Sequence, residues 1–317
     1  MKKIVVLDGK TLGKINFDPL KEIGSLSFYE TTKPEEVIER IKDANIILTN
    51  KVVLNEDNLK HAKNLELICE TATGYNNIDI NYAKSRNIGV TNVAGYSTNT
   101  VAQHTFATIL SLVHKINFYD NLVKSKEYSN SGLFTNLDRP FYELEGKTYG
   151  IIGFGAIGKR VAKIAEAFGA KVVYYSTSGK NTDSEYKRVE FEELLSSCDI
   201  ISIHAPLNEN TKGLINYEAL RRMKKSAIIV NMGRGSIIVE SDLAKAIDEN
   251  IIAGAALDVF EVEPVNENNP LLSVKNKENL ILTPHIAWAG IEARERLFNE
   301  VLLNIKAYYN NEIRNRI

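Results

Sequence analysis

The sequence predicts an α/β fold of two domains, the second built on a doubly wound parallel sheet. Short apolar runs alternate with helical stretches along most of the chain, which is typical of βαβ units. The runs of the second half are nearly continuous in apolar residues and do not alternate, as expected for parallel strands that helices cover on both faces. The length of 317 residues is sufficient for two domains of roughly 100 to 200 residues each.

The first part of the chain predicts one α/β unit. Its five β-rich runs are Ile4–Leu7, Ser27–Tyr29, Ile46–Leu48, Leu67–Cys69 and Gly89–Thr91. Helical stretches separate them, among them Pro34–Ile41 and Asn58–Lys63. After Gly95, either Ser97 or Thr98 can act as the N-cap of a long apolar helix, which is expected to carry the chain into the second domain.

A second alternating series begins at Tyr149. The apolar runs IIGFG, VVYYS, IISIHAP, AIIVNMG, IAGAALDV and LILTPHI predict its strands. Before it, Ser125–Tyr142 is polar and without periodicity, which indicates a loop or a dimer arm. The tail Glu292–Tyr309 predicts a helix that packs back on the first unit. We therefore expect a discontinuous domain of residues 1–97 and 291–317, and a second domain of residues 98–290.

A glycine fingerprint opens the second series. Gly153, Gly155 and Gly158 follow the β-rich run KTYGII and precede the helical stretch KRVAKIAEAF. This order of strand, glycine turn and helix is the one that a dinucleotide-binding turn requires. The first glycine permits the tight turn, the second lets the backbone approach a pyrophosphate, and the third lets the helix pack on the strand. The helix start then favours the phosphate charge.

Composition excludes several classes of partner. Lys and Arg total 39 against 40 Asp and Glu, so nothing favours a nucleic acid or an anionic membrane. Cys69 and Cys198 lie in apolar runs without the spacing of a metal site, as expected of buried thiols in a reducing compartment. The amino end has too short an apolar stretch for a signal peptide, and no run of about 18 apolar residues occurs. We expect a cytoplasmic protein without a bound metal.

Three polar residues follow apolar strands of the second series. Arg234 lies near the end of AIIVNMGRG. Asp258 and Glu263 lie in the second half of IAGAALDVFEVEP, and His285 lies in LILTPHIAW. Ligands of doubly wound sheets bind beyond the carboxyl ends of the strands. Arginine can hold a carboxylate through two parallel hydrogen bonds. A histidine beside a carboxylate can act as general acid for a carbonyl reduction and as base for the reverse reaction. The three residues therefore predict hydride chemistry.

The other histidines receive different interpretations. His204 ends the run ISIHAP and is expected to line the cofactor pocket without taking part in chemistry. His61, His104 and His114 lie on helical stretches and are interpreted as structural.

Five motifs in order, GFGAIG, HAPLNENT, NMGRG, ALDVFEVEP and TPHIAWA, resemble the D-isomer specific 2-hydroxyacid dehydrogenase family over nearly the whole sequence. The resemblance implies two Rossmann-like domains: a doubly wound NAD(P)-binding domain and a smaller, discontinuous, flavodoxin-like substrate domain. It implies that Arg234 holds the carboxylate and carbonyl of a 2-oxo acid. It also implies that Glu263 favours the protonated form of His285, which gives the proton while NAD(P)H gives the hydride.

The resemblance further implies a set of binding residues. Backbone N–H groups of Thr73 and Gly74, in TATGYNNID, would meet the substrate carboxylate. Asp258 would lie near the nicotinamide amide, and Thr98 would reach the nicotinamide side. The alternative for the residues that act through their backbone is that they only form ordinary turns. The cofactor-binding residues are expected to be Thr98, Gly153, Gly155, Ala156, Ile157, Gly158, Ser176, His204, Ala205, Pro206, Thr211, Met232, Gly233 and Asp258.

The choice between NAD and NADP depends on Ser176. An NAD-selective dinucleotide fold usually has an acid there to bind the ribose hydroxyls. With Ser176 no carboxylate repels a 2′-phosphate, and Lys180 is close enough in sequence to attract one. The sequence favours NAD and leaves NADP open.

Within the family, AGYSTNTVAQHTFA and TPHIAWA most resemble glycerate dehydrogenases, also called hydroxypyruvate reductases. The expected substrates are hydroxypyruvate and glyoxylate, with Trp288 either walling a small pocket or anchoring the core. The alternative enzyme is a dehydrogenase of D-lactate or of branched D-2-hydroxy acids. A cofactor-sensing, corepressor-like binding protein is the alternative from another class. By analogy with the family, we expect a homodimer that binds neither nucleic acid nor a membrane.

Overall fold

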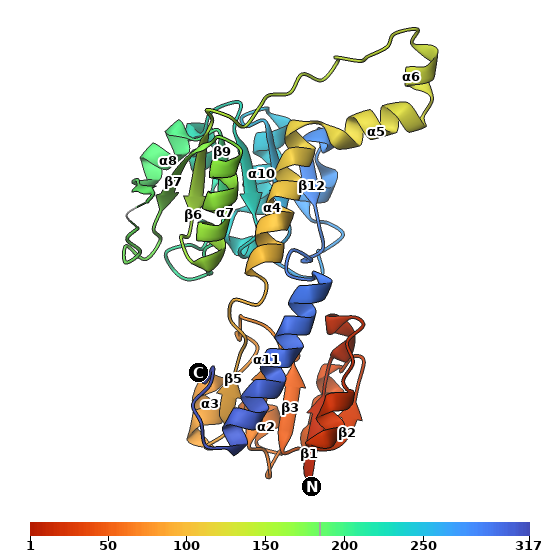
Figure 1. The fold of residues 1–317 in the computed structure, drawn as a ribbon, viewed down its shortest axis with the longest axis vertical. Coiled ribbons are helices and arrows are strands. Elements are labelled where there is room, and N and C mark those ends of the chain that lie inside the picture. Colours follow the sequence, from red (N-terminus) through yellow and green to blue (C-terminus); the bar gives the residue numbers. More distant parts are fainter. Residues whose placement is uncertain (184) are drawn as a thin grey trace. The chain divides into compact units, whose positions relative to one another are not determined.

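The protein forms two compact units in the computed structural model, which describes residues 1–183 and 185–317. The first unit comprises Met1–Ser97 and Trp288–Ile317, and the second comprises Thr98–Ala287. Figure 1 shows the ribbon coloured along the sequence. The backbone returns to the first unit at Trp288, whereas the sequence placed this boundary at residues 290–291. In the described ranges no helix is long and apolar enough to span a membrane.

The first unit is built on a five-stranded parallel sheet with the order β2-β1-β3-β4-β5. Each β-rich run predicted for this part of the protein forms one of these strands. The strands are β1 (Lys2–Val6), β2 (Gly24–Phe28), β3 (Ile46–Thr49), β4 (Leu67–Glu70) and β5 (Gly89–Thr91).

Helices cover both faces of this sheet. They are α1 (Val37–Ile41), α2 (Glu56–Leu59), α3 (Ile80–Ser85) and α11 (Ile291–Tyr309), with 3-10 turns at Gly9–Leu12, Asp18–Glu22 and Pro34–Glu36. The predicted bounds of α2, residues 58–63, were wrong. The side chain of Asn55 accepts a hydrogen bond from the Asn58 backbone N–H, so this N-cap starts the helix two residues earlier.

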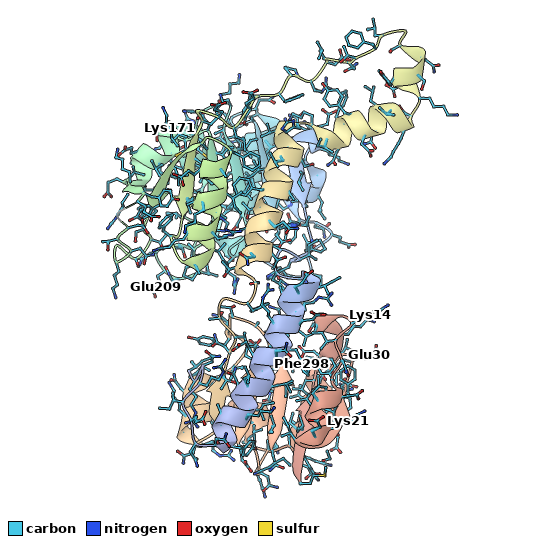
Figure 2. All side chains as sticks on the ribbon, viewed as in Figure 1. Lys14, Lys21, Glu30, Lys171, Glu209 and Phe298 are labelled. Carbon is cyan, nitrogen blue, oxygen red and sulfur yellow. The ribbon has the colours of Figure 1, made fainter. Side chains whose placement is uncertain are left out.

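The apolar face of α11 explains why the first unit is discontinuous. Leu297, Val301 and Ile305 are fully buried against the strands. Phe298 of the same helix, labelled in Figure 2, packs edge-on against the ring of Phe17 at a centroid distance of 5.1 Å. Trp288 packs against this same core. Of the two roles expected for it, a pocket wall or a core anchor, this contact corresponds to the core anchor.

The second unit is built on a seven-stranded parallel sheet with the order β12-β11-β10-β9-β6-β7-β8. The strand order reverses between β6 and β9, and such a switch point is where doubly wound sheets bind ligands. Strand β8 was not predicted, because its two residues are exposed and charged and carry no apolar signal. The strands are β6 (Thr148–Ile152), β7 (Lys171–Tyr175), β8 (Lys187–Arg188), β9 (Ile200–Ile203), β10 (Ile228–Asn231), β11 (Gly254–Leu257) and β12 (Leu280–Leu282).

The helices of the second unit include the expected long one. They are α4 (Thr98–Val113), α5 (Ile116–Lys124), α6 (Glu127–Asn130), α7 (Ala156–Ala167), α8 (Phe191–Ser197), α9 (Tyr217–Arg222) and α10 (Glu240–Asp248), with 3-10 turns at Gly235–Ile237, Pro270–Ser273 and Lys277–Asn279. Helix α4 packs against α7 and β11. The segment interpreted as a loop or dimer arm contains the short α6, and α5 and α6 project from the rest of the second unit (Figure 1).

Candidate active site

The glycine turn joins β6 to α7. Gly153 has a φ of +90°, and a Cβ there would lie 2.6 Å from the backbone nitrogen of Ala205. A Cβ at Gly158 would overlap the carbonyl oxygen of Gly153, so the close approach of α7 to the strand requires glycine here too. At Gly155, by contrast, a Cβ would meet nothing within 4 Å. The first and third glycines therefore serve packing, and the second leaves the backbone open.

This open position lies at the start of a helix that suits an anion. Gly155 is the N-cap of the 12-residue α7 and offers no side-chain cap. The first amide N–H groups of a helix, including those of Ala156 and Ile157, have no partner inside it, and the helix dipole favours negative charge at this end. The turn thus fits the pyrophosphate of a dinucleotide.

His204 follows β9 and is neutral at physiological pH. Its Nε2 lies 3.0 Å from the Ser202 hydroxyl, and its Nδ1 is buried without a hydrogen-bond partner in the described part of the protein. Burial lowers the pKa of the imidazole to about 3. A neutral ring is suited to lining a site and unsuited to giving a proton at pH 7.

The loop after β9 is closed by Thr211. This side chain is fully buried, and its hydroxyl donates to the Pro206 carbonyl at 2.7 Å and accepts from the Asn208 N–H at 2.8 Å. The resemblance implies that Thr211 touches the cofactor; in the structure its hydroxyl shapes the loop that presents Pro206.

Gly233 brings the loops after β9 and β10 together. Its N–H donates to the Asn231 side chain at 3.0 Å, and a Cβ on it would lie 2.8 Å from the carbonyl oxygen of Ala205. Both Ala205 and the neighbouring Met232 are buried. Glycine at 233 is therefore what allows these two loops to pack.

Arg234 lies directly after this contact. The side chain is half-buried, and its Nη1 donates to the Gly233 carbonyl at 2.8 Å. Among residues 1–183 and 185–317, no carboxylate forms an ion pair with this guanidinium. The remaining donors are therefore suited to a ligand carboxylate, since a guanidinium can hold one through two parallel hydrogen bonds.

The loop of Arg234 packs on the loop of Glu263. A Cβ on Gly235 would overlap the backbone of Phe260, so only glycine permits this contact. The Phe260 N–H in turn donates to Glu263 Oε1 at 3.0 Å. The segments that carry Arg234 and Glu263 are thus joined by direct packing.

His285 and Glu263 form a close pair. His285 Nδ1 lies 2.7 Å from Glu263 Oε2, and the two side chains are 26% and 33% exposed. The carboxylate is fixed on its other oxygen by Phe260, so it orients the ring. Nε2 is then the ring nitrogen that Glu263 does not engage.

The backbone of His285 is strained. Its φ of +54° lies in the left-handed region, which residues that bear a side chain rarely adopt and which costs on the order of 1–3 kcal/mol. Such a conformation persists only where the surroundings enforce it. Here the His285 N–H donates to the Thr283 carbonyl at 3.0 Å.

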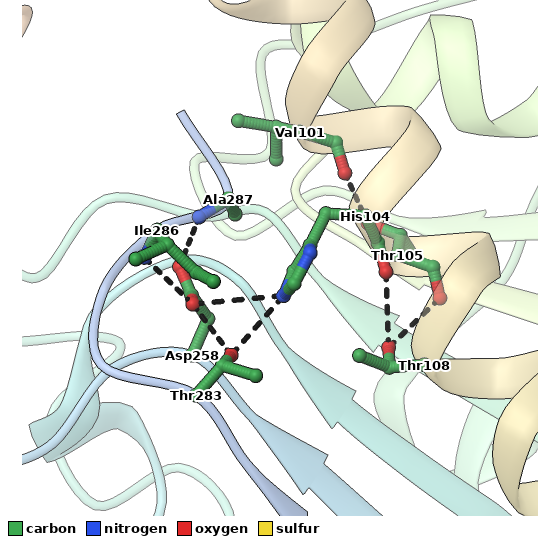
Figure 3. A network of polar contacts seen from close by, with 8 residues as sticks. All are labelled: Val101, His104, Thr105, Thr108, Asp258, Thr283, Ile286 and Ala287. Carbon is green, nitrogen blue, oxygen red and sulfur yellow. Dashed lines mark hydrogen bonds and ion pairs between the residues drawn. The ribbon is translucent and has the colours of Figure 1, made fainter. Parts of the chain in front are cut away.

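Asp258 holds the segment after His285. Its side chain is 1% exposed, and its two oxygens accept the N–H groups of Ile286 at 2.9 Å and Ala287 at 2.8 Å. The Thr283 hydroxyl also donates to it, at 2.6 Å (Figure 3). The resemblance implies that Asp258 lies near the nicotinamide amide; in the structure its carboxylate anchors the backbone around His285.

The remaining predicted site residues lie at loop and helix starts. The Thr73 hydroxyl donates to the Val93 carbonyl at 2.8 Å, and its own carbonyl accepts from Asn92 at 2.7 Å, so the turn that includes Gly74 is tied to the segment after β5. Thr98 is the first residue of α4. Ser176 follows β7 and is 3% exposed, and its hydroxyl accepts the Asn181 N–H at 3.2 Å.

A buried carboxyl that the sequence did not single out lies just before the Thr73 turn. Glu70, the last residue of β4, is fully buried; Asn77 donates to one of its oxygens at 3.0 Å, and the other has no partner among the described residues. Burial raises its pKa to about 9; Asp8 adds to the rise, while Asn77 and Lys51 oppose it.

Glu70→Gln is expected to raise Tm at pH 8, and the gain should shrink toward pH 5. The folded protein keeps this proton up to about pH 9, whereas the unfolded chain loses it near 4.5. The unfolded state thus binds fewer protons between these values, and Glu70 lowers stability as pH rises. Thermal unfolding from pH 5 to 9 measures the effect.

Glu66→Gln is the matched control with the opposite sign. Burial opposes ionisation of Glu66, but hydrogen bonds from Lys2 and Tyr309 hold its pKa below its usual range. This variant should lose stability above the unfolded-state pKa. An unchanged or lower Tm for Glu70→Gln at pH 8 would contradict the interpretation of Glu70.

Comparison with known proteins adds independent information. The family model described as "D-isomer specific 2-hydroxyacid dehydrogenase, NAD binding domain" matches residues 106–287. The chain is 39% identical over 315 residues to the hydroxypyruvate reductase of Blautia hydrogenotrophica, covering 96% of each protein. It is 38% identical over 313 residues to the glycerate dehydrogenase of Methylorubrum extorquens, covering 97% of this chain and 96% of that one. The D-lactate dehydrogenase of Aquifex aeolicus, solved with NAD and lactic acid, is 30% identical and superposes with a TM-score of 0.84, covering 98% of this chain and 96% of that one.

Proposed function

The chain belongs to the D-isomer specific 2-hydroxyacid dehydrogenase family, and we propose that within it the protein reduces hydroxypyruvate, and also glyoxylate, with NAD(P)H. The products are D-glycerate and glycolate. The observation that carries this proposal is the 2.7 Å contact between His285 and Glu263, together with the packing of the Glu263 loop against the loop of Arg234.

His285 is the proton donor in this proposal. The imidazole gives its Nε2 proton to the carbonyl oxygen of the 2-oxo acid and takes it back in the reverse reaction. Glu263 orients the ring through Nδ1. The reduced nicotinamide, when bound, supplies the hydride that reaches the carbonyl carbon.

Arg234 binds the substrate in this proposal. The planar guanidinium holds the carboxylate and polarises the carbonyl, with Gly233 fixing one of its nitrogens. The amides of Thr73 and Gly74 add donors to the substrate carboxylate. Gly155, Ala156 and Ile157 hold the pyrophosphate at the start of α7.

Steady-state oxidation of NADH and NADPH tests this proposal with hydroxypyruvate, glyoxylate, pyruvate and 2-oxoisocaproate. We expect the highest kcat/KM with hydroxypyruvate and turnover of glyoxylate. A preference for pyruvate or 2-oxoisocaproate would assign the protein to the enzymes of D-lactate or of branched 2-hydroxy acids. Tight NADH binding without turnover of any acid would favour a cofactor-sensing binding protein.

The cofactor preference follows from the residue after β7. Ser176→Asp is expected to lower kcat/KM for NADPH at least about tenfold more than for NADH, because a carboxylate there repels the 2′-phosphate and binds the ribose hydroxyls. The wild type, with Ser176, should accept both cofactors. The measurement is kcat/KM for each cofactor at saturating hydroxypyruvate.

Ser196→Asp serves as the control because it adds the same charge on the exposed face of α8. It should leave the ratio of the two kcat/KM values unchanged. If the ratio of kcat/KM for NADPH to kcat/KM for NADH were the same in Ser176→Asp and the wild type, residue 176 would not determine the cofactor preference.

We also propose that the protein is a homodimer. The supporting feature is the segment that begins with α5 and α6 and continues to β6. Leu133, Phe134 and Leu137, which lie between α6 and β6, are 67%, 92% and 78% exposed. A groove of about 360 Å³ at the base of this segment is lined by Leu112, Phe118, Leu122 and Ile281 among others. Exposed apolar side chains, together with a groove of the same protein that has apolar residues in its lining, are suited to a self-complementary interface.

Phe134→Ser combined with Leu137→Ser is expected to yield monomers, because the two changes remove the most exposed apolar groups of the segment. Light scattering after size-exclusion chromatography gives the mass. Ile313→Ser, an equally exposed apolar residue in the first unit, should leave the dimer intact. A monomeric wild type would overturn the assignment.

We place the protein in the cytoplasm. The supporting observation is that Cys69 and Cys198 are both buried and unpaired, as is usual in reducing compartments.

A further inference from the structure

The strained backbone of His285 is held from outside its own loop. The N–H groups of the next two residues, Ile286 and Ala287, donate to the two oxygens of Asp258 (Figure 3). Whatever fixes this carboxylate therefore fixes the peptide that carries the His285 ring. Asp258 is almost completely buried, so solvent does not take part in fixing it.

The carboxylate is fixed in turn by Thr283. The Thr283 hydroxyl donates to Asp258 Oδ1 at 2.6 Å, and the Thr283 carbonyl accepts the His285 N–H at 3.0 Å. Thr283 thus holds the N–H of His285 directly and the residues after His285 through Asp258. The Thr283 hydroxyl has a single proton, which it donates to Asp258.

A third residue completes this series of contacts from a distant part of the sequence. His104, on α4, places its Nε2 3.1 Å from the Thr283 hydroxyl oxygen and 3.7 Å from Asp258 Oδ1. Because the Thr283 proton goes to Asp258, the hydroxyl can only accept from His104, so His104 Nε2 carries a hydrogen. The bonds then run in one direction, from His104 through Thr283 to Asp258, and each strengthens the next.

We propose that His104 is a positioning residue for the reduction: through Thr283 and Asp258 it holds the backbone that presents His285. This inference rests on the proposed function, since it concerns the proton donor of that reaction. His104 acts through other residues, so it is not itself a catalytic residue. Its loss should affect the rate of the chemical step more than substrate or cofactor binding.

Two pairs of variants test the proposal. Thr283→Val removes the hydroxyl and keeps the shape, whereas Thr283→Ser keeps the hydroxyl. His104→Leu removes the ring N–H, whereas His104→Gln keeps an N–H that can donate. We expect Thr283→Val and His104→Leu to lower kcat by about 10- to 100-fold, because displacement of a reacting group by an ångström has effects of this size. KM for hydroxypyruvate and the Kd of NADH should change less than about threefold, since these variants leave the groups that bind substrate and cofactor in place.

The conservative variants and the double variant sharpen the result. Thr283→Ser and His104→Gln should recover most of kcat. The double variant His104→Leu with Thr283→Val should be no slower than the slower single variant, because both changes break the same series of bonds. Additive losses would place the two residues in separate roles and overturn the proposal.

Thr105→Val is the matched control. Thr105 is a fully buried threonine next to His104 on α4, but its hydroxyl donates to Val101 of its own helix. The same chemical change there should leave kcat within about threefold, while any general loss of stability from a buried Thr→Val change would appear in its Tm. A kcat loss in Thr105→Val as large as in Thr283→Val would show a structural effect only and overturn the proposal.

Amide hydrogen exchange provides a readout that needs no turnover. Thr283→Val and His104→Leu should speed exchange at Ile286 and Ala287 in the NADH-bound protein, and Thr105→Val should not. Faster exchange in a protein that turns over no 2-oxo acid would refute the proposed function and retain the positioning. Unchanged exchange and unchanged kcat in a protein that reduces hydroxypyruvate would refute the positioning alone.

Discussion

His285→Ala is expected to lower kcat for hydroxypyruvate reduction by about 10²- to 10⁴-fold, which is the usual contribution of a positioned general acid. The Kd of NADH should change little, because the glycine turn at Gly155 lies on a different loop. Stopped-flow or steady-state NADH oxidation gives kcat, and fluorescence titration of NADH gives the Kd. Glu263→Gln should produce a smaller loss, since the amide still contacts Nδ1 but no longer carries the charge.

His61→Ala is the control for this prediction. His61 is exposed and lies just after α2 in the first unit, so the same change of residue should leave kcat unchanged. If His285→Ala retained more than a tenth of the wild-type kcat with an unchanged pH profile, the proton would have to come from another group.

Arg234→Lys is expected to lower kcat/KM by about 10- to 100-fold, which corresponds to the roughly 1.5–3 kcal/mol of a hydrogen bond to a charged group. Lysine keeps the charge but lacks the planar fork that binds a carboxylate through two bonds. Most of the loss should appear as a higher KM, because lysine keeps the positive charge that polarises the carbonyl but loses one of the two bonds to the carboxylate, which are made equally in the ground state and the transition state. Steady-state kinetics over a wide range of hydroxypyruvate concentration separates kcat from KM.

Arg222→Lys on α9 is the matched control, because this arginine is exposed and pairs with Glu192 on the surface. Surface ion pairs contribute little, so both kinetic constants should stay at the wild-type values. An Arg234→Lys enzyme with wild-type KM for every 2-oxo acid would exclude Arg234 from carboxylate binding.

Much of the fold could be predicted because buried parallel strands leave a plain apolar signal. The runs around Ile46, Leu67 and Ile229 form central strands and are apolar on both faces. Strand β8 carries no such signal because its two residues are exposed and charged, and it was not predicted. The predicted start of α2 was wrong because the side chain of Asn55 caps the helix, which therefore begins at Glu56.

The candidate site was predictable only where a residue acts from the end of a strand. Arg234, Glu263 and His285 follow β10, β11 and β12, so their order in the sequence predicts their neighbourhood. The positive φ of His285 has no sequence signal, because it is enforced by contacts with residues that are distant in sequence.

His104 was interpreted as structural because it lies on a helix. Its spacing of three from Val101 and four from Thr108 places it on the buried stripe of α4. A polar ring on such a stripe needs a partner, and this signal was available in the sequence.

Transfer of deuterium to hydroxypyruvate from NADH that carries deuterium at both C4 positions tests directly whether the protein is a D-specific dehydrogenase with His285 as its proton donor. In the wild type we expect the label at C2 of D-glycerate, as measured by NMR and chiral chromatography. His285→Ala should bind the labelled cofactor but form the product far more slowly. Glycerate without deuterium at C2, formation of the L-isomer, or an equal rate of product formation in His285→Ala would contradict this function.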